Sequence, residues 1–194
     1  MNLLVVVDMQ NDFIDGSLGS EAAQAIVPNV VKKIADADDD TMIIFTQDTH
    51  FEDYDYSLEG KLLPVKHCIY NTDGWLINKA VRSAWLSKED AITILEPEFR
   101  ENNTTIKTTF GSVQLMNFLC RSGGTFDEIE FIGLDSDICV VSNALMARAA
   151  LPDMPIVVDA SCCAGSTPEK HKAALEVMKS CQIDIINESN ESEV

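Results

Sequence analysis

The chain has few positively charged residues. Its 194 residues include 14 lysines and arginines against 32 aspartates and glutamates, which gives a formal net charge of −18 at pH 7. So acidic a chain repels the phosphates of nucleic acids and of anionic lipids. We therefore expect neither nucleic acid nor membrane as a partner, and a small-molecule substrate fits the charge better.

Long apolar runs are also missing. No run approaches the roughly 20 residues that a membrane-spanning helix needs. The apolar run Leu3–Val7 follows Met1 without the basic segment of an export signal. The six cysteines show no Cys-x-x-Cys spacing, and most lie within apolar segments. These features predict reduced, buried thiols in a cytoplasmic protein.

Short apolar runs alternate with helical patterns along the whole length. This alternation predicts an α/β fold, in which a mainly parallel sheet carries helices on both faces. We expect one domain over residues 1–187 and a polar tail over 188–194. The expected strands are residues 3–7, 42–46, 91–95, 128–132, 156–158 and 183–186, and the expected helices are 22–37, part of 74–86, 112–121, the segment that follows residue 139, and 168–180.

Cys139 is the most informative single residue. It lies where an apolar strand turns through a short polar loop into a helix. The free N–H groups and partial positive charge of a helix N-terminus favour an anion, and a thiolate is the reactive form of cysteine. The position predicts a nucleophilic thiol, with nearby N–H groups that can hold an oxyanion.

Asp8 and Lys107 are candidates to assist this thiol. Asp8 ends the first apolar run, where its carboxylate could act as a general base. Lys107 lies in a β-prone segment, and its ammonium could stabilise both a carboxylate and a thiolate. Aspartates often close strands, and lysines usually lie at the surface. The catalytic roles of Asp8 and Lys107 therefore require that the fold brings both side chains to Cys139.

A second group has the composition of a metal site. Asp48 and His50 are two residues apart in an extended segment, so both side chains point the same way. His67 lies towards the far end of the long segment 52–72. Glu59, in the same segment, could add a further ligand directly or through water. One carboxylate and two imidazoles suit zinc, and also manganese or iron(II). His171 lies on a polar helix face, where we expect it to be exposed.

Taken together, these segments resemble the isochorismatase-like cysteine hydrolases and, among them, the nicotinamidases. The resemblance covers nearly the whole chain in the matching order. The segments that carry it are VDMQNDF (7–13), TQDTH (46–50), PVKHC (64–68), KTTFGS (107–112) and GLDSDICV (133–140).

The resemblance implies a fold and a set of catalytic residues. The fold is a three-layer, Rossmann-like sandwich around a six-stranded parallel sheet. The catalytic triad is carried here by Asp8, Lys107 and Cys139. A non-proline cis peptide is implied between Leu134 and Asp135, with the backbone N–H groups of Asp135 and Cys139 facing the oxyanion. Homo-oligomers are common among such relatives, and we expect one here.

The nicotinamidase branch adds a metal and a ring-binding residue. Asp48, His50 and His67 match its metal positions, and Phe13 matches a residue that packs on the substrate ring. Two positions depart from the pattern. Leu62 and Leu63 stand where a tryptophan is usual.

Asp135 is the second departure, because a small uncharged residue is usual there. If its carboxylate pointed inward, it would raise the pKa of Cys139 and oppose an oxyanion. If it pointed outward, it could select a cationic or hydrogen-bond-donating substrate.

The function expected from these observations is hydrolysis of a small amide, with nicotinamide first, through a thioester on Cys139. One alternative keeps the fold and changes the substrate to a carbamoyl compound, an N-substituted amide or an isochorismate-like vinyl ether. Another is a non-catalytic binding protein built on a decayed hydrolase fold.

Overall fold

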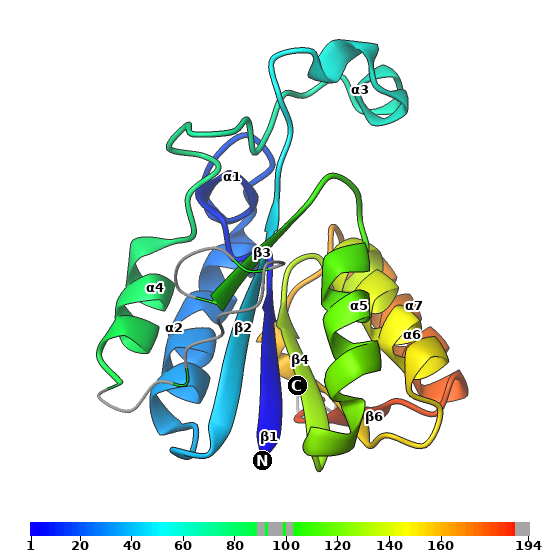
Figure 1. The fold of residues 1–194 in the computed structure, drawn as a ribbon. Helices are drawn as coiled ribbons and strands as arrows, with labels where there is room; N and C mark the ends of the chain where they lie inside the picture. The colour runs from blue at the N-terminus through cyan, green and yellow to red at the C-terminus, as the bar shows by residue number, and fades with distance from the viewer. Residues whose placement is uncertain (89–91, 93–98, 100–102, 189–194) are drawn as a thin grey trace, which may run out of the picture.

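Six strands form one parallel sheet at the centre of the molecule (Figure 1). The computed structural model describes residues 1–88, 92, 99 and 103–188. Every strand pair in the described sheet is parallel, and the order is β3-β2-β1-β4-β5-β6. The α/β prediction is confirmed, while the strand expected over 91–95 lies outside the described residues. The strands are β1 (Asn2–Val7), β2 (Thr41–Asp48), β3 (Thr104–Lys107), β4 (Glu128–Gly133), β5 (Ile156–Cys163) and β6 (Asp184–Ile186).

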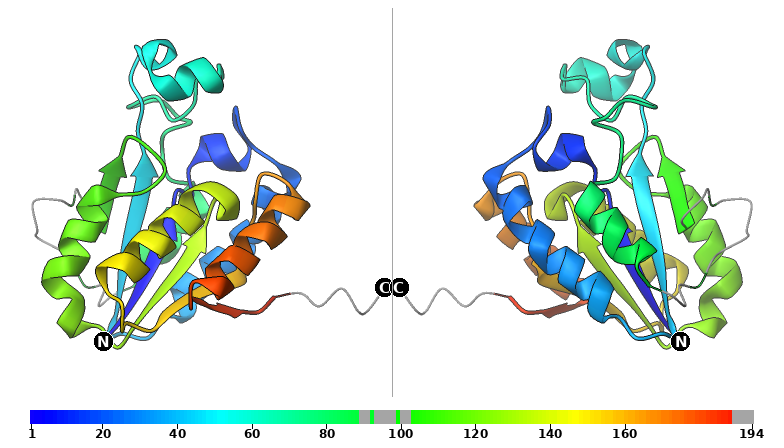
Figure 2. Two further views of the ribbon diagram at one scale, coloured as in Figure 1. Left: turned by 90° about the vertical axis from the view of Figure 1, so that its right-hand side faces the viewer. Right: turned by 90° about the vertical axis from the view of Figure 1, so that its left-hand side faces the viewer.

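Helices cover both faces of the sheet (Figure 2). Helices α2 and α4 pack together on one face, and α5, α6 and α7 lie on the other. The helices are α1 (Asn11–Ile14), α2 (Glu21–Asp36), α3 (Leu58–Leu62), α4 (Lys79–Leu86), α5 (Val113–Ser122), α6 (Val141–Ala150) and α7 (Pro168–Ser180), with 3-10 turns η1 (Tyr54–Tyr56) and η3 (Gly123–Thr125) and a π-helical turn η4 (Ser136–Val140).

Strand β1 shows why the sheet needs both layers. Leu3, Val5 and Val7 belong to the core beneath α5, α6 and α7, whereas Leu4 and Val6 belong to the core beneath α2 and α4. Successive side chains of a strand point to opposite faces, so a continuous apolar run is stable only when both faces are covered.

The helix boundaries follow from local chemistry. The side chain of Ser20 accepts a hydrogen bond from the amide of Ala23 at the start of α2. Thr167 does the same for α7, which has a proline in its first turn. Side chains of this kind satisfy amides that have no partner within the helix. Helix α2 then buries one stripe of apolar residues, as its spacing predicted.

The segment between β2 and α4 extends beyond the carboxyl edge of the sheet. It carries η1 and α3, which stand apart from the rest of the molecule in Figures 1 and 2. The sequence predicted an irregular segment here, whereas the structure forms a short helix that Ser57 caps by accepting from Gly60. No helix among the described residues is long and apolar enough to cross a bilayer.

Candidate active site

Three side chains from different strand ends meet at the carboxyl edge of the sheet. Asp8 follows β1, Lys107 ends β3, and Cys139 lies in η4 after β4. All three are buried, with 0%, 2% and 5% of their surface exposed. The Nζ atom of Lys107 lies 2.7 Å from Oδ2 of Asp8 and 3.4 Å from Sγ of Cys139. The structure thus brings together the three residues of the predicted triad.

Neighbouring strands hold Asp8 in place. Its backbone adopts a left-handed conformation, with φ of 46°, directly after β1. The hydroxyl of Thr46 on β2 donates to Oδ1 of Asp8 at 2.7 Å. The other carboxylate oxygen lies 2.7 Å from Nζ of Lys107 as an ion pair and has no aligned hydrogen-bond donor among the described residues. This oxygen is therefore available to receive the proton of the thiol.

Gly133 permits the chain to turn between β4 and the nucleophile. Its φ is +118°, and a Cβ atom there would lie 2.1 Å from the carbonyl oxygen of Val7. Only glycine combines that conformation with so close an approach to a neighbouring strand. The peptide bond between Leu134 and Asp135 is cis, as the resemblance implied. The N–H of Asp135 makes no hydrogen bond to the described part of the chain, so it is free to serve an oxyanion.

The electrostatics of the thiol differ from the expectation. Burial raises the pKa of Cys139 well above its usual value, and the charges of Asp8 and Asp48 add to this effect while Lys107 opposes it. The sequence predicts a helix N-terminus that favours the thiolate, whereas in the folded protein desolvation of the thiolate is the larger effect. Burial also raises the pKa of Asp8 against the opposing charge of Lys107. The thiol therefore rests protonated beside a carboxylate that is a stronger base than an exposed aspartate.

Lys107 joins this site to the predicted metal ligands. Its Nζ atom also lies 3.2 Å from Oδ1 of Asp48. Burial favours the neutral amine, but the charges of Asp8 and Asp48 outweigh burial and hold the pKa of Lys107 well above its usual value, and a thiolate at Cys139 would raise it further. One ammonium thus neutralises part of both carboxylates.

The four predicted metal ligands converge. One donor atom each from Asp48, His50, Glu59 and His67 lies within 4.8 Å of the others. Nε2 of His50 is 3.0 Å from Asp48 and 3.7 Å from Glu59, and Nε2 of His67 is 3.6 Å and 3.5 Å from the same two carboxylates. Donors about 2.1 Å from a tetrahedral zinc ion are about 3.4 Å from one another. The donor set therefore fits a divalent cation.

The protonation of His67 agrees with this reading. Burial would lower its pKa, but hydrogen bonds to Asp48 and Glu59 raise the pKa to about 10. A proton thus occupies the position between the carboxylates that a cation would take. Nδ1 of the ring lies 2.8 Å from the carbonyl oxygen of Val65, which fixes the ring and leaves Nε2 for a metal.

Two further residues of the segment 7–13 support these ligands. The amide of Gln10 donates to the carbonyl oxygen of Asp48 and accepts from its N–H, at 2.9 and 2.7 Å. A carboxylate oxygen of Asp12 accepts from the N–H of Cys68, next to His67, at 2.7 Å. Sequence reasoning missed both residues, although they lie in the same segment as Asp8, which was the available signal.

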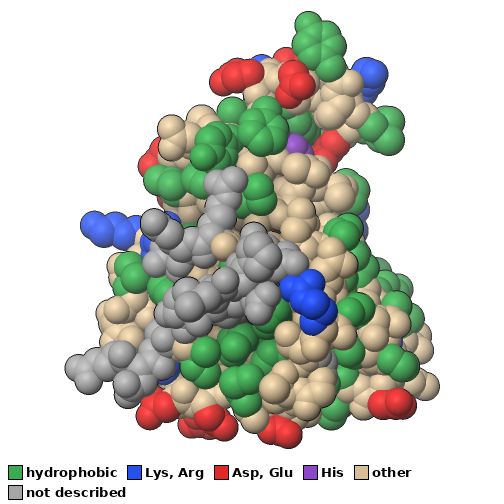
Figure 3. All heavy atoms as spheres, in the orientation of Figure 1, with side chains coloured by type: hydrophobic (Ala, Val, Ile, Leu, Met, Phe, Trp, Pro, Cys, Tyr) green, Lys and Arg blue, Asp and Glu red, His purple; other side chains and the backbone are tan. Residues whose placement is uncertain are grey.

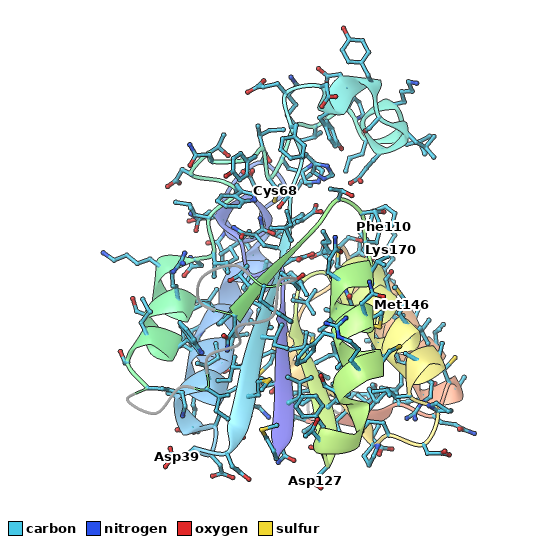
Figure 4. All side chains as sticks on the ribbon, viewed as in Figure 1. Asp39, Cys68, Phe110, Asp127, Met146 and Lys170 are labelled. Atoms are coloured by element: carbon cyan, nitrogen blue, oxygen red, sulfur yellow. The ribbon has the colours of Figure 1, made fainter. Side chains whose placement is uncertain are left out.

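Figure 4 places these contacts in the molecule. Cys68 lies above the strand ends, at the base of the projecting segment, whereas Asp39 and Asp127 mark the opposite edge. In the space-filling view, histidine atoms reach the surface beneath that segment (Figure 3). A cleft of about 310 Å³ opens beside His50.

Aromatic residues line the metal end of the site. Phe13 is 7% exposed, and its ring centroid lies 5.6 Å from that of His67. Leu62, where a tryptophan is usual, is 79% exposed. Tyr54 is buried, with ring centroids 4.8 Å from His50 and 5.2 Å from His67. Sequence reasoning missed Tyr54, because its burial depends on how the segment folds back.

Asp135 and His171 lie at the two ends of the contacts around η4. The carboxyl group of Asp135 is partly buried and makes no hydrogen bond or ion pair with the described residues; burial and the charges of Asp137 and Asp8 raise its pKa to about 7. His171 was expected to be exposed, but it is half-buried and its Nδ1 lies 2.8 Å from Oγ of Ser136. His171 is half-buried because α7 packs against η4.

The parallel sheet of the described residues, with a buried cysteine, lysine and aspartate at its carboxyl edge, places the chain among the hydrolases of the α/β fold class. Residues 2–189 match the family model described as an isochorismatase domain, and the chain belongs to that family. This confirms the family inferred from the motifs.

Curated relatives point to one branch of the family. The chain is 26% identical over 204 residues to a nicotinamidase/pyrazinamidase of Mycobacterium tuberculosis, covering 96% of this chain and 98% of the relative. It is 29% identical over 189 residues to a probable inactive nicotinamidase of Arabidopsis thaliana, covering 91% and 87%.

Solved structures agree on the fold. A pyrazinamidase/nicotinamidase from Streptococcus mutans superposes with a TM-score of 0.78 at 26% identity, covering 96% of this chain and all of the other. A pyrazinamidase of Pyrococcus horikoshii in complex with zinc gives 0.72 at 25% identity, covering 95% and 98%.

Proposed function

We propose that this protein hydrolyses a small primary amide, with nicotinamide as the first candidate, and releases ammonia through a thioester on Cys139. The observation that carries the proposal is that Asp8 and Cys139 both lie within 3.4 Å of the ammonium of Lys107. The relatives named as nicotinamidases support the choice of substrate.

The first half of the reaction uses the contacts at the triad. Asp8 removes the proton from Cys139, and the thiolate attacks the carboxamide carbon. The N–H groups of Asp135 and Cys139 stabilise the oxyanion, and Lys107 stabilises the anionic side chains. The proton then passes from Asp8 to the amide nitrogen, the C–N bond breaks, and ammonia leaves the acyl group on sulfur.

The second half returns the enzyme to its starting state. Water attacks the thioester while Asp8 takes a proton from it. The C–S bond breaks, the acid leaves, and Asp8 returns the proton to the thiolate of Cys139.

The metal assignment is part of the proposal. Asp48, His50, His67 and Glu59 would hold a zinc ion, or manganese or iron(II), a choice that the zinc-bound relative favours. A divalent cation there supplies a Lewis acid that lowers the pKa of a coordinated water. Phe13 and Tyr54 would enclose an aromatic substrate on the side of the two histidines.

A second candidate substrate class is favoured by Asp135. Its carboxyl group interacts with the charges of Asp137, Asp8 and Lys170, but it makes no hydrogen bond or ion pair with the described residues. A substrate that donates an N–H, such as an N-substituted amide or a carbamoyl compound, would give it one.

Cellular location and assembly also remain predictions. All six cysteines are free, which fits a cytoplasmic protein. The projecting segment exposes three large apolar side chains, Tyr56, Leu58 and Leu62, at 75–81% of their surface. An exposed group of this kind supports association with a second copy of the chain.

The test is ammonia release from nicotinamide by zinc-reconstituted protein. We expect turnover in the wild type, loss of at least about 10⁴-fold in Cys139→Ala, and normal rates in Cys120→Ala, whose thiol is exposed. Turnover that survives in Cys139→Ala would exclude the mechanism. No turnover in a wild type whose Cys139 still reacts with iodoacetamide would exclude nicotinamide and direct the search to the second class. An inert Cys139 would indicate a non-catalytic protein.

A further inference from the structure

The loop that presents the oxyanion amide is attached to the segment between β5 and α7. Ser136, which directly follows Asp135, is fully buried. Its N–H donates to the carbonyl oxygen of Ala164 at 2.8 Å, and its hydroxyl shares a 2.8 Å hydrogen bond with Nδ1 of His171 on α7. The N–H and the hydroxyl of Ser136 are therefore both bound by residues that follow β5, and neither contacts the thiol of Cys139.

The next residue is attached in the same way. The two carboxylate oxygens of Asp137 accept from the N–H and the hydroxyl of Ser166, each at 2.7 Å. Gly165 allows this close approach, because a Cβ atom there would lie 2.8 Å from Oδ1 of Asp137, 2.9 Å from Oγ of Ser136 and 3.0 Å from Cα of His171. We call the contacts from Ala164, Gly165, Ser166 and His171 the outer clamp.

The other side of the loop is attached to the sheet. The N–H of Leu134 donates to the carbonyl oxygen of Val7 at 3.0 Å, one residue before Asp8. The N–H of Asp135 thus lies between a point fixed to β1 and a point fixed by the outer clamp. An oxyanion donor works only when its N–H is about 2.7–3.1 Å from the developing charge, so a small movement of the loop reduces catalysis.

We propose that His171 is a positioning residue that holds Ser136 and thereby aims the N–H of Asp135 at the oxyanion. The proposal rests on the proposed function for its substrate and for the oxyanion role of the Asp135 N–H, while the contacts that hold Ser136 are those of the structure. His171 touches no reacting atom, and its effect passes through the hydroxyl of Ser136. Gly165 is required because it brings α7 close enough for this contact.

The variants separate the hydrogen bond from the packing. His171→Leu fills the space without a polar atom, whereas His171→Asn keeps one near the place of Nδ1. We expect His171→Leu to lower kcat for amide hydrolysis by about 10- to 100-fold with KM changed less than about twofold. His171→Asn should recover most of that loss. Val177→Ala, at an exposed position of the same helix, should change neither constant.

Two reagents that attack the same sulfur make the test independent of the substrate. An aldehyde, pyridine-3-carbaldehyde or propionaldehyde, adds to Cys139 to form a tetrahedral adduct whose oxygen needs the oxyanion donors. Iodoacetamide alkylates the sulfur by displacing iodide and develops no such charge. In His171→Leu the affinity for the aldehydes should fall by about the same factor as kcat, while the alkylation rate stays within about twofold.

Three results would overturn the proposal: unchanged kcat and aldehyde affinity in His171→Leu, an equal loss of the alkylation rate, or no recovery in His171→Asn. If the wild type does not hydrolyse nicotinamide, the proposed function fails, and the comparison of aldehyde with iodoacetamide still decides the role of His171. Gly165→Ala offers a second variant, and we expect it to weaken the aldehyde adduct in the same way.

Discussion

Lys33 and Lys107 each lie between two carboxylates at the sheet, and the two clusters differ in how many hydrogen bonds those carboxylates accept. Lys33 on α2 is 2.7 Å from both Glu130 and Asp159. Asp159 also accepts from the N–H and hydroxyl of Ser161 and from the amide of Asn187. The cluster borders a cleft of about 490 Å³, and the side chains of Lys33 and Glu130 are 27% and 18% exposed.

Lys107 has the same kind of partners in a different setting. Its side chain and those of Asp8 and Asp48 are at most 5% exposed. One oxygen of each carboxylate has no aligned hydrogen-bond donor among the described residues, and a thiol lies 3.4 Å from the ammonium. A buried charge with incomplete hydrogen bonding is costly, and such groups have shifted pKa values. The carboxylates around Lys33 are well hydrogen-bonded and stabilise the fold. The carboxylates around Lys107 each keep an oxygen that can accept a proton.

The largest effect should follow from Lys107→Met. It leaves Asp8 and Asp48 buried without their cation, so at least one of them takes a proton. We expect hydrolysis to fall by about 10³-fold or more and the free energy of unfolding to fall by about 3–5 kcal/mol. Ammonia release and urea unfolding measure the two effects. Turnover within tenfold of the wild type would show that the cation is dispensable.

Removal of a metal ligand should have the next largest effect. His50→Ala leaves three donors, and we expect the affinity for zinc to fall by at least about 100-fold. Competition with a chelating dye measures it, together with the zinc content of the purified protein. Tyr54→Phe is the matched control, because Tyr54 packs on the same imidazoles and its hydroxyl donates to the carbonyl oxygen of Leu63 instead. Equal zinc affinity in all three proteins would contradict the assignment.

Asp135→Asn should change stability in a pH-dependent way. The pKa of Asp135 is raised to about 7 in the folded state, so folding favours its protonated form. The free energy of unfolding of the wild type should fall relative to that of the variant as the pH rises from about 4 to about 7. Above about pH 7 the difference between the two free energies should stay constant. Allowing for solvent screening, we expect about 1–2 kcal/mol at pH 8 and none at pH 4.

Denaturant unfolding at several pH values measures this difference. Asp39→Asn, at an exposed position on the opposite edge, is the control for the loss of one surface carboxylate. A difference that is the same at pH 4 and pH 8 would mean that the carboxyl group keeps an ordinary pKa.

The smallest effect should come from Lys33→Met. Asp159 keeps its contacts with Ser161 and Asn187, and Glu130 remains partly solvated. We expect a loss of about 1 kcal/mol in the free energy of unfolding and no change in hydrolysis. A loss as large as that in Lys107→Met would remove the distinction between the clusters.

Local patterns account for most of what the sequence predicted. The order of strands and helices follows from apolar periodicity, because each element must bury a face. Asp8 and Cys139 were identifiable because both follow strands of a parallel sheet, whose carboxyl ends lie at one edge. Glu59 lies beside the two histidines, where the sequence predicted a further metal ligand. The short helix α3 that carries Glu59 shows no clear apolar periodicity in the sequence.

The sequence by itself determined the α/β order of elements, the family, and which polar side chains reach the carboxyl edge, since these depend on local periodicity and spacing. Only the tertiary structure decided the raised pKa of Cys139, the burial of Tyr54 beside the metal ligands, and the contact of His171 with Ser136. These depend on desolvation and on packing between segments far apart in the chain, which no local pattern records.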